Sequence, residues 1–322
     1  MRSVILGTGS CLPERTMTNK DLEAIVDTSD EWIVQRTGIR ERRIAADGQT
    51  TADMAIESAR HALQAAGLHG ADIDGVIVAT STPDTTFPSV AVKVQAALNI
   101  CQGPAFDVHA VCAGFIYALT VADSLLRTGV ARRLLVVGAE KMSSILNWED
   151  RTTCVLFGDG AGALVLEAQE GRGEIADRGI ISTHLHADGH LRDILYVNGG
   201  VSSTQTAGHI VMEGKEVFRH AVALMADVVT EAMSHNGIGP EEIDWLVPHQ
   251  ANIRIIEGTA RKLDVRLDQV ILTVDRHGNT SAASIPLALD EAVRDGRIQR
   301  GHLMLLEALG SGLTWGAALI RY

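Results

Sequence analysis

Two stretches of the chain share one pattern, Ile73-Asp74-Gly75-Val76-Ile77-Val78 and Ile243-Asp244-Trp245-Leu246-Val247, and lie roughly 170 residues apart. Each begins six residues after a glycine that is followed by an aliphatic residue, Gly67-Leu68 or Gly237-Ile238. A short apolar run bounded by turn signals is typical of a buried strand. The repeat therefore predicts two halves built on one plan.

A stretch with helical periodicity precedes each copy, from about Thr51 to Ala66 and from about Lys215 to His235. Apolar residues recur three or four positions apart on one face of each: Ile56, Ala59 and Leu63 in the first, and Val217, Ala221, Leu224 and Val228 in the second. Such spacing predicts amphipathic helices that cover a core.

The order of elements after each copy is repeated too. A predicted helix after Cys112 leads to the strand 134–137, and another after Ser281 leads to the strand 303–306. A glycine-rich turn then precedes a last apolar strand in each half, 158–162 before 163–166 and 310–312 before 317–320. Strands alternating with helices predict mostly parallel sheets covered by helices. We therefore expect an α/β protein with two pseudo-symmetric halves, residues 1–172 and 173–322.

The composition excludes several classes of protein. The chain has 322 residues, of which 46% are hydrophobic, so it can bury a large core. Its apolar runs are far shorter than the roughly 20 residues of a membrane-spanning helix, and no signal peptide is expected. A net charge of −12 argues against a general nucleic-acid binder. Four cysteines in a chain of this length favour a cytoplasmic location over a disulfide scaffold.

Cys112 is the first candidate for a catalytic residue. It lies in the run 106–114, where an apolar stretch meets a predicted helix. A thiol at a helix N-terminus faces unpaired N–H groups and the positive end of the helix dipole, which stabilise the thiolate. The same turn places backbone N–H groups where an oxyanion could be bound. A buried cysteine with only a packing role is the alternative.

His249 and Asn279 are the second and third candidates. His249 follows the predicted strand 245–248, and in open α/β sheets ligands gather at the carboxyl ends of strands. Asn279 precedes the helix that corresponds to the one after Cys112. If the halves are related as the repeat implies, both helix starts point to one centre, where the three side chains converge. A structural histidine and a turn asparagine are the alternatives.

Other chemistries have weaker support. His184, His186 and His190 lie close together in the sequence, but no cysteine or carboxylate cluster completes a metal site. The glycine-rich run 158–162 leads into a strand, whereas a dinucleotide-binding fingerprint opens a helix. No phosphate-binding Gly-Lys-Ser/Thr loop is present either. We therefore expect neither a metal nor a bound cofactor.

With these residues in view, the whole chain resembles the β-ketoacyl-acyl-carrier-protein synthase III family, condensing enzymes of the thiolase fold that initiate bacterial type II fatty-acid synthesis. The resemblance rests on six motifs in the same order: Asp30–Arg40, Phe106–Gly114, Phe157–Gly162, Val247–Asn252, His277–Ser284 and Gly310–Gly316. It implies a layered αβαβα thiolase fold. It also implies an acyltransferase that condenses an acyl-CoA primer, acetyl by default, with malonyl-acyl carrier protein.

The resemblance assigns roles to the three candidates. Cys112 would carry the acyl group, while His249 and Asn279 would promote decarboxylation of the malonyl group. A His–Asn–Cys set marks the initiating branch of these enzymes rather than the elongating one. The backbone N–H groups of Cys112 and Ser311 would bind the oxyanion. Acyl-CoA is a substrate in this scheme, so no cofactor is implied.

The same resemblance implies three binding surfaces. Trp32 and Arg151 would hold the adenine of CoA between them. Other contacts to CoA would come from Thr28, Arg36, Gly214 and Asn252. Phe87 would reach across a homodimer interface and close the acyl pocket of the partner. Acyl carrier protein would dock on a local basic patch that includes Gln250, Ala251, Ile253, Arg254, Arg219, Arg261 and Lys262.

Two positions depart from the usual family pattern. Ser311 stands in the middle of the C-terminal glycine run, where glycine is common, and its Cβ restricts φ. Val111 precedes the nucleophile where alanine is frequent, which would change the shape of the acyl pocket. The length and branching of the primer stay open, as does the choice between malonyl-acyl carrier protein and malonyl-CoA.

Several other functions share part of this pattern. Condensing enzymes of secondary metabolism with a different starter would keep the same three residues and are the main alternative. A degradative thiolase needs a second active-site cysteine near the C-terminus, and no cysteine follows Cys154. A non-catalytic partner subunit would lack the nucleophile or the His/Asn pair. A cysteine hydrolase would release the acyl group to water without forming a carbon–carbon bond.

Overall fold

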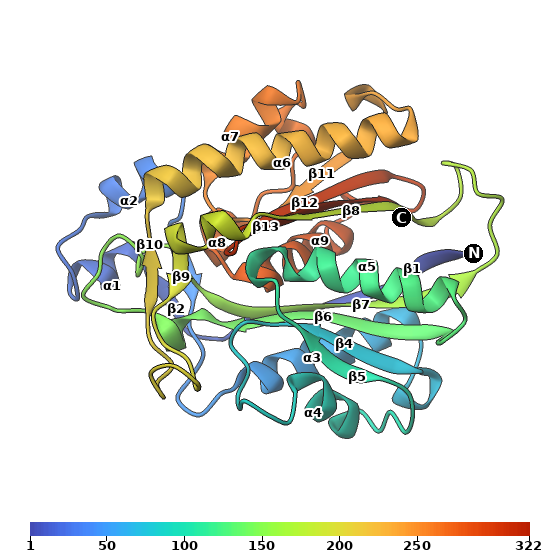
Figure 1. Cartoon of the computed structure of the whole chain (residues 1–322), viewed down its shortest axis with the longest axis horizontal. Coiled ribbons are helices and arrows are strands. Elements are labelled where there is room, and N and C mark those ends of the chain that lie inside the picture. Colours follow the sequence, from blue (N-terminus) through green and yellow to red (C-terminus); the bar gives the residue numbers. More distant parts are fainter.

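Two mixed β-sheets form the centre of the molecule, and the computed structural model describes residues 1–322 (Figure 1). The first sheet has the strand order β1-β7-β6-β4-β5. Its strands are β1 (Arg2–Cys11), β4 (Gly75–Ala79), β5 (Ala105–Val108), β6 (Arg133–Lys141) and β7 (Asp159–Gln169). The second has the order β11-β12-β13-β8. Its strands are β8 (Gly179–Ala187), β11 (Trp245–Pro248), β12 (Leu303–Gly310) and β13 (Thr314–Arg321).

Helices cover both sheets and separate them, which gives the layer order αβαβα (Figure 1). The outer helices of the first sheet are α3 (Thr51–Ala66) and α4 (Val90–Ala97). Between the sheets lie α5 (Gly114–Arg127) and α9 (Ser284–Arg294). Helices α6 (Gly214–Asn236) and α7 (Ile253–Lys262) cover the second sheet. The smaller elements are α1 (Asn19–Glu23), α2 (Asp30–Thr37), α8 (Val274–His277), the pair β2 (Thr16–Thr18) and β3 (Glu41–Arg43), and the pair β9 (Leu195–Val197) and β10 (Ile210–Met212).

Each sheet is buried on both faces, which explains the continuous apolar runs in the sequence. In β6, Leu134 and Val136 pack on the central helices, while Leu135 and Val137 pack beneath α3 and α4. In β12, Leu306 likewise faces the central layer. Because neighbouring residues of a strand point to opposite faces, a strand between two helical layers must be apolar at nearly every position. No helix combines the length and the apolar character needed to cross a membrane.

The expectation of mostly parallel sheets was wrong. The β4–β5, β4–β6 and β11–β12 pairs are parallel, but β1–β7, β6–β7, β12–β13 and β13–β8 are antiparallel. The reason is clearest between β12 and β13, which are joined only by residues 311–313. A connection this short can make only an antiparallel hairpin, because a parallel pair needs a crossover of about a dozen residues.

The two halves do follow one plan. A single 3-10 turn precedes each central helix, Val111–Ala113 before α5 and Ser281–Ala283 before α9. The first residue of each turn has a positive φ, 48° at Val111 and 49° at Ser281. The proposed boundary between residues 172 and 173 falls between β7 and β8. It stays a prediction, since α9 packs against strands of both sheets.

Candidate active site

The candidate nucleophile lies between the sheets, at the point where the first half turns into its central helix. Strand β5 ends at Val108, and Cys112 occupies the 3-10 turn just before α5, with 5% of its surface exposed. The second half closes over it at Gly310, where an added Cβ would lie 2.7 Å from the backbone nitrogen of Cys112. Glycine at this position lets the end of β12 approach the amide of the nucleophile.

The Cys112 side chain is a thiol in the resting molecule. Burial raises its pKa to about 12, and the carboxyl of Glu140 adds to the rise, while a hydrogen bond with Ser281 opposes it. The expectation that the helix N-terminus holds a thiolate is therefore not met. Burial disfavours the thiolate because it removes the solvation of a charged group.

Glu140 is a site residue that the sequence reasoning missed. Its carboxyl group, at the end of β6, is fully buried and has no cationic partner. Instead it accepts hydrogen bonds from Ser81, Thr82 (2.5 Å) and Ser281 (3.0 Å). A glutamate at the end of an otherwise apolar strand was the available signal, because such a residue must find polar partners when it is buried.

His249 follows β11 and is 2% exposed. Burial lowers its pKa to about 3, so the ring is neutral at physiological pH. Its Nδ1 lies 2.7 Å from Oγ of Ser284, which also accepts the backbone N–H of Gln250. The Ser284 hydroxyl hydrogen is then free to donate to Nδ1, which leaves the ring proton on Nε2. Ser284 is the last residue of the motif His277–Ser284, but no role was predicted for it from the sequence.

Asn279 is also oriented by a neighbour. Its Oδ1 accepts the backbone N–H of Ser281 at 2.8 Å. Its own backbone pairs with Leu156 and Gly158, so the first half of the chain holds it in place. With Oδ1 occupied, the Nδ2 donor is the end of the amide left for a substrate.

One segment, residues 279–284, joins the three candidates. Ser281 contacts Cys112 and donates its backbone N–H to Oδ1 of Asn279, and Ser284 contacts His249. The backbone N–H of His249 also donates to the carbonyl of Glu307 in β12. A buried thiol and two side chains with free N–H donors are thus brought together from both halves.

Comparison with known proteins agrees with this arrangement. Family models for 3-oxoacyl-[acyl-carrier-protein] synthase III match residues 106–189, and for its C-terminal part residues 233–322. The chain is 63% identical to the β-ketoacyl-[acyl-carrier-protein] synthase III of Rhodospirillum centenum, over all of this chain and 99% of the relative. The enzyme of that name from Allorhizobium ampelinum is 61% identical over the full length of both.

The solved structure of 3-oxoacyl-[acyl-carrier-protein] synthase III from Aquifex aeolicus superposes with a TM-score of 0.94 at 48% identity, covering 99% of this chain and all of that one. The chain belongs to the β-ketoacyl-acyl-carrier-protein synthase III family. The thiolase fold expected from the family resemblance is confirmed by these matches.

The two departures from the synthase III pattern are accommodated in different ways. Ser311 does not adopt a positive φ, and its hydroxyl donates to the carbonyl of Leu195 in β9. A Cβ at this position therefore causes no strain. Val111 does adopt a positive φ, which is unusual for a β-branched residue. The strain lies directly beside the nucleophile, as is common at functional sites.

The residues expected to bind CoA gather where α2 meets α7. The guanidinium carbons of Arg36 and Arg151 lie 4.5 Å and 5.2 Å from the centre of the Trp32 ring. Arg151 also donates to the carbonyl of Asp27. Thr28 lies nearby in the chain with its hydroxyl buried and without a partner. An adenine held between Trp32 and Arg151 would require the two side chains to separate.

The other predicted substrate contacts are more scattered. Asn252 caps α7, and its Nδ2 donates to the carbonyl of Arg36 at 3.0 Å, which ties it to α2. Gly214 begins α6, and a Cβ added there would lie 3.6 Å from the terminal methyl group of Met212. Phe87 lies in the loop before α4 and is 83% exposed.

We predict that Trp32→Ala raises the KM for acyl-CoA about tenfold, because loss of one stacking contact of this kind costs roughly 1.4 kcal/mol. Turnover at saturating acyl-CoA should hardly change. Malonyl-acyl carrier protein has no adenine and provides an internal control, so its KM should stay the same. Steady-state kinetics with each substrate varied in turn would check this. An equal rise in both values would contradict a role in holding adenine.

The predicted docking residues divide into four groups. Arg254 and Arg261 on α7 are exposed and form no ion pair, and Arg254 stacks over Phe218. Arg219 and Lys262 are exposed too, but they pair with Glu216 and Asp227. Ala251 and Ile253 are partly exposed. Gln250 is fully buried and its side chain is directed into the protein, which does not fit a residue that contacts the carrier protein.

Glu307, next to His249 in the sheet, is a second buried acid. Neither of its carboxyl oxygens has a hydrogen-bond partner, and burial raises its pKa to about 8. An unfolded chain would release this proton near pH 4.3. The folded chain holds the proton until about pH 8, so the stability that it contributes is lost as pH rises from about 4.3 to about 8.

The free energy of unfolding of the wild type should fall as pH rises from 5 to 8. In Glu307→Gln this slope should be less steep, by up to about 1.4 kcal/mol per pH unit. Urea unfolding of both proteins at several pH values would measure the slope. Substitution of the exposed Glu149 by glutamine controls for the loss of one negative charge. Parallel pH profiles for wild type and Glu307→Gln would show that Glu307 is ionised in the folded state.

No group of three or more histidine, cysteine or acidic side chains is arranged to hold a metal ion. His184 and His186 both contact the carboxylate of Glu231, at 3.0 Å and 2.6 Å. His190 lies in the short 3-10 helix Gly189–Ile194 that follows β8. The polar cluster around Glu231 lies between β8 and α6, on the other side of the second sheet from α5.

Proposed function

We propose that the chain catalyses the initiating condensation of fatty-acid synthesis, in which an acyl-CoA primer and malonyl-acyl carrier protein give 3-ketoacyl-acyl carrier protein, CoA and CO2. The observation that carries this proposal is the segment 279–284, which contacts both Cys112 and His249 and includes Asn279. A nucleophile and two N–H donors beside each other are what acyl transfer followed by decarboxylation requires.

In the first step the Cys112 sulfur attacks the thioester carbonyl of the primer. A carbon–sulfur bond forms to Cys112 and the bond to CoA breaks. Because burial raises the pKa of the thiol to about 12, the thiol must lose its proton during the attack, and the departing CoA sulfur takes up one proton. The backbone N–H groups of Cys112 and Ser311 would bind the oxyanion as it forms.

In the second step the malonyl thioester carbonyl accepts hydrogen bonds from Nε2–H of His249 and Nδ2–H of Asn279. The bond to the carboxylate breaks, CO2 leaves, and the electron pair forms an enolate that these two donors stabilise. The enolate carbon attacks the acyl group on Cys112 and displaces the sulfur, which recovers a proton. A neutral His249 suits this task, because Nδ1 accepts the Ser284 hydroxyl hydrogen and the remaining Nε2–H is available as a donor.

Three further features follow as part of the proposal. Arg254 and Arg261 offer unpaired positive charge on an otherwise acidic chain, which suits an acidic carrier protein. Strand β5 is the last strand of its sheet, and exposed Phe87 lies in the loop after its neighbour β4, which favours a homodimer. Four free cysteines favour a cytoplasmic location. Sedimentation that gave only a monomer would exclude the dimer.

The test of this function is reconstitution with a panel of acyl-CoA primers and malonyl-acyl carrier protein. We expect one acyl group on the protein after the first substrate, and 3-ketoacyl-acyl carrier protein with one equivalent of CO2 after the second. The primer that labels fastest identifies the natural starter. Release of free acid without a carbon–carbon bond would instead indicate a hydrolase. Condensation only with unusual starters would favour an enzyme of secondary metabolism.

A further inference from the structure

Gln250 directly follows His249, yet its side chain has no exposed surface. Its Nε2 group donates to the carbonyls of Pro248 at 2.8 Å and Ile271 at 3.0 Å. Its Oε1 accepts the backbone N–H groups of Thr273 at 2.8 Å and Val274 at 3.1 Å. Both hydrogens and both lone pairs of the amide are therefore used, and only one orientation of the group satisfies them.

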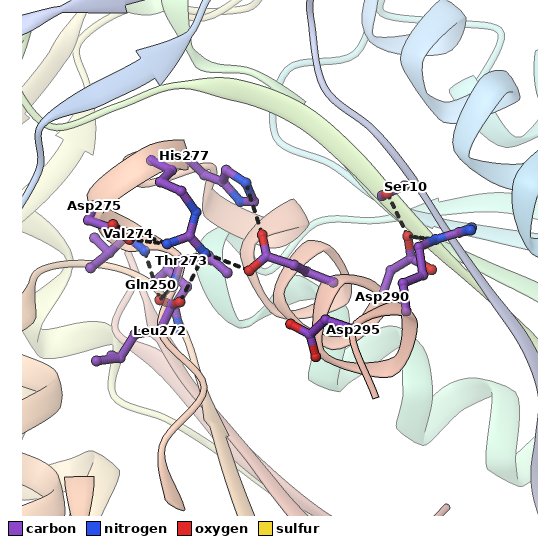
Figure 2. A network of polar contacts seen from close by, with 12 residues as sticks. Ser10, Gln250, Leu272, Thr273, Val274, Asp275, His277, Asp290 and Asp295 are labelled. Carbon is purple, nitrogen blue, oxygen red and sulfur yellow. Dashed lines mark hydrogen bonds and ion pairs between the residues drawn. The ribbon is translucent and has the colours of Figure 1, made fainter. Parts of the chain in front are cut away.

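The two ends of this amide hold different parts of the candidate active site. Pro248 ends β11, the strand that carries His249. Thr273 and Val274 begin α8, and Asn279 follows five residues after Val274. Figure 2 shows Gln250 beside Thr273 and Val274 at the start of this short helix. A single side chain thus connects the element before one predicted donor with the element before the other.

Helix α8 depends on Gln250 at its N-terminus. The first N–H groups of a helix lack partners inside it, and the N-cap residue Thr273 makes no side-chain hydrogen bond to them. Gln250 supplies the missing acceptor from outside the helix. At the other end of α8, Arg276 pairs with Glu291 of α9, and His277 Nε2 lies 3.6 Å from the same carboxylate (Figure 2). The helix is therefore fixed on both sides before the chain reaches Asn279.

We propose that Gln250 is a positioning residue for decarboxylation, which sets the spacing between His249 and Asn279, and that it takes no part in carrier docking. The proposal rests on the proposed function for its kinetic consequences. Its neighbour Arg254, exposed and unpaired on the same stretch, has the opposite properties and provides a matched control.

Gln250→Glu tests the proposal with almost no change of shape. A protonated glutamate at this position can still donate one of the two hydrogen bonds that Nε2 makes to the carbonyls of Pro248 and Ile271. An ionised glutamate donates neither and places a negative charge beside both carbonyl oxygens. We expect decarboxylation of malonyl-CoA and of malonyl-acyl carrier protein to fall equally, by roughly 100-fold, since displacements of about 1 Å have effects of that size. The loss should deepen as pH rises. Acylation of Cys112 and the KM for the carrier should stay within about threefold of wild type.

The control separates the two roles that Gln250 could have. Arg254→Ala should raise the KM for malonyl-acyl carrier protein by a larger factor than it changes malonyl-CoA decarboxylation. If Gln250→Glu behaves in the same way, Gln250 is a docking residue and the proposal is overturned. If acylation and decarboxylation fall together, its role is only structural, which also overturns it. Gln250→Met, which removes all four hydrogen bonds, should show the same selective loss without the added dependence on pH.

Hydrogen exchange on the wild-type protein provides a test that needs no variant. The amides of Thr273 and Val274 should exchange slowly, because Gln250 accepts both, and fast exchange at these two positions would overturn the proposal. This measurement does not depend on the proposed function. A wild-type protein that decarboxylates no malonyl thioester would refute the function. Slow exchange at Thr273 and Val274 would still support the hydrogen bonds from these two amides to Gln250.

Discussion

Replacement of Cys112 by alanine should leave the protein unable to take up an acyl group from any acyl-CoA primer. No other side chain in the site can form the thioester, so condensation should fall by more than about 10⁴-fold, as is common when a covalent nucleophile is removed. Intact-protein mass spectrometry after incubation with the primer would measure the adduct directly. Since Cys112 is 5% exposed and smaller alanine keeps the turn, the fold should survive the change.

The other cysteines provide controls for this experiment. Cys101 is exposed, so a merely reactive thiol should be labelled there first. We expect Cys101→Ala to leave the acyl adduct intact and Cys112→Ala to abolish it. An adduct that survives in Cys112→Ala would show that Cys112 is not the acyl carrier, and the two-step mechanism would then fail.

Asn279→Asp should separate the two steps of the reaction. The aspartate retains an oxygen that can accept the Ser281 N–H, but it has lost the Nδ2 donor. Removing one donor from a developing oxyanion costs about 10² to 10³ in rate, and the added negative charge works in the same direction. Acylation of Cys112 should continue at nearly the wild-type rate, so the variant should accumulate as acyl-enzyme in the presence of malonyl-acyl carrier protein.

Rapid-quench measurements of acyl-enzyme formation and of CO2 release would distinguish the steps. Asn279→Ala provides the comparison, since it removes the donor without adding charge but also loses the contact to Ser281. We expect Asn279→Ala to slow CO2 release as well. If acylation slows as much as CO2 release in both variants, Asn279 acts through the local fold of the segment 279–284 and not as a donor to the enolate.

Helices could be predicted from local sequence, because the residues at and next to each end of a helix determine where it begins and ends. Helix α3 runs over Thr51–Ala66 as expected, since Thr50 and Asp53 form a capping box and Gly67 ends the helix with a φ of 67°. Helix α6, expected from about Lys215 to His235, extends one residue further at each end. Strand directions were predicted less well, because a run of apolar residues is compatible with either a parallel or an antiparallel neighbouring strand.

Candidate residues could be selected from the sequence, but their chemical state could not. The motifs around Cys112, His249 and Asn279 identified the three side chains. The raised pKa of Cys112 depends on burial by parts of the chain that are distant in sequence, and on the carboxyl group of Glu140. The inward direction of Gln250 depends in the same way on Thr273 and Val274, more than 20 residues downstream. Such contacts become visible only when the chain is folded.

The equal backbone geometry at Val111 and Ser281 has a consequence for how this enzyme can evolve. The residues that follow them, Cys112 and Ala282, occupy matching places in the two halves, so a duplicated ancestor would have had two similar centres. One copy now holds the sulfur, and the other has only a methyl group at that place. A complete reaction therefore needs groups from both halves. A substitution in one half at the contact between the halves therefore requires a compensating substitution in the other half. The two halves are expected to diverge together rather than independently.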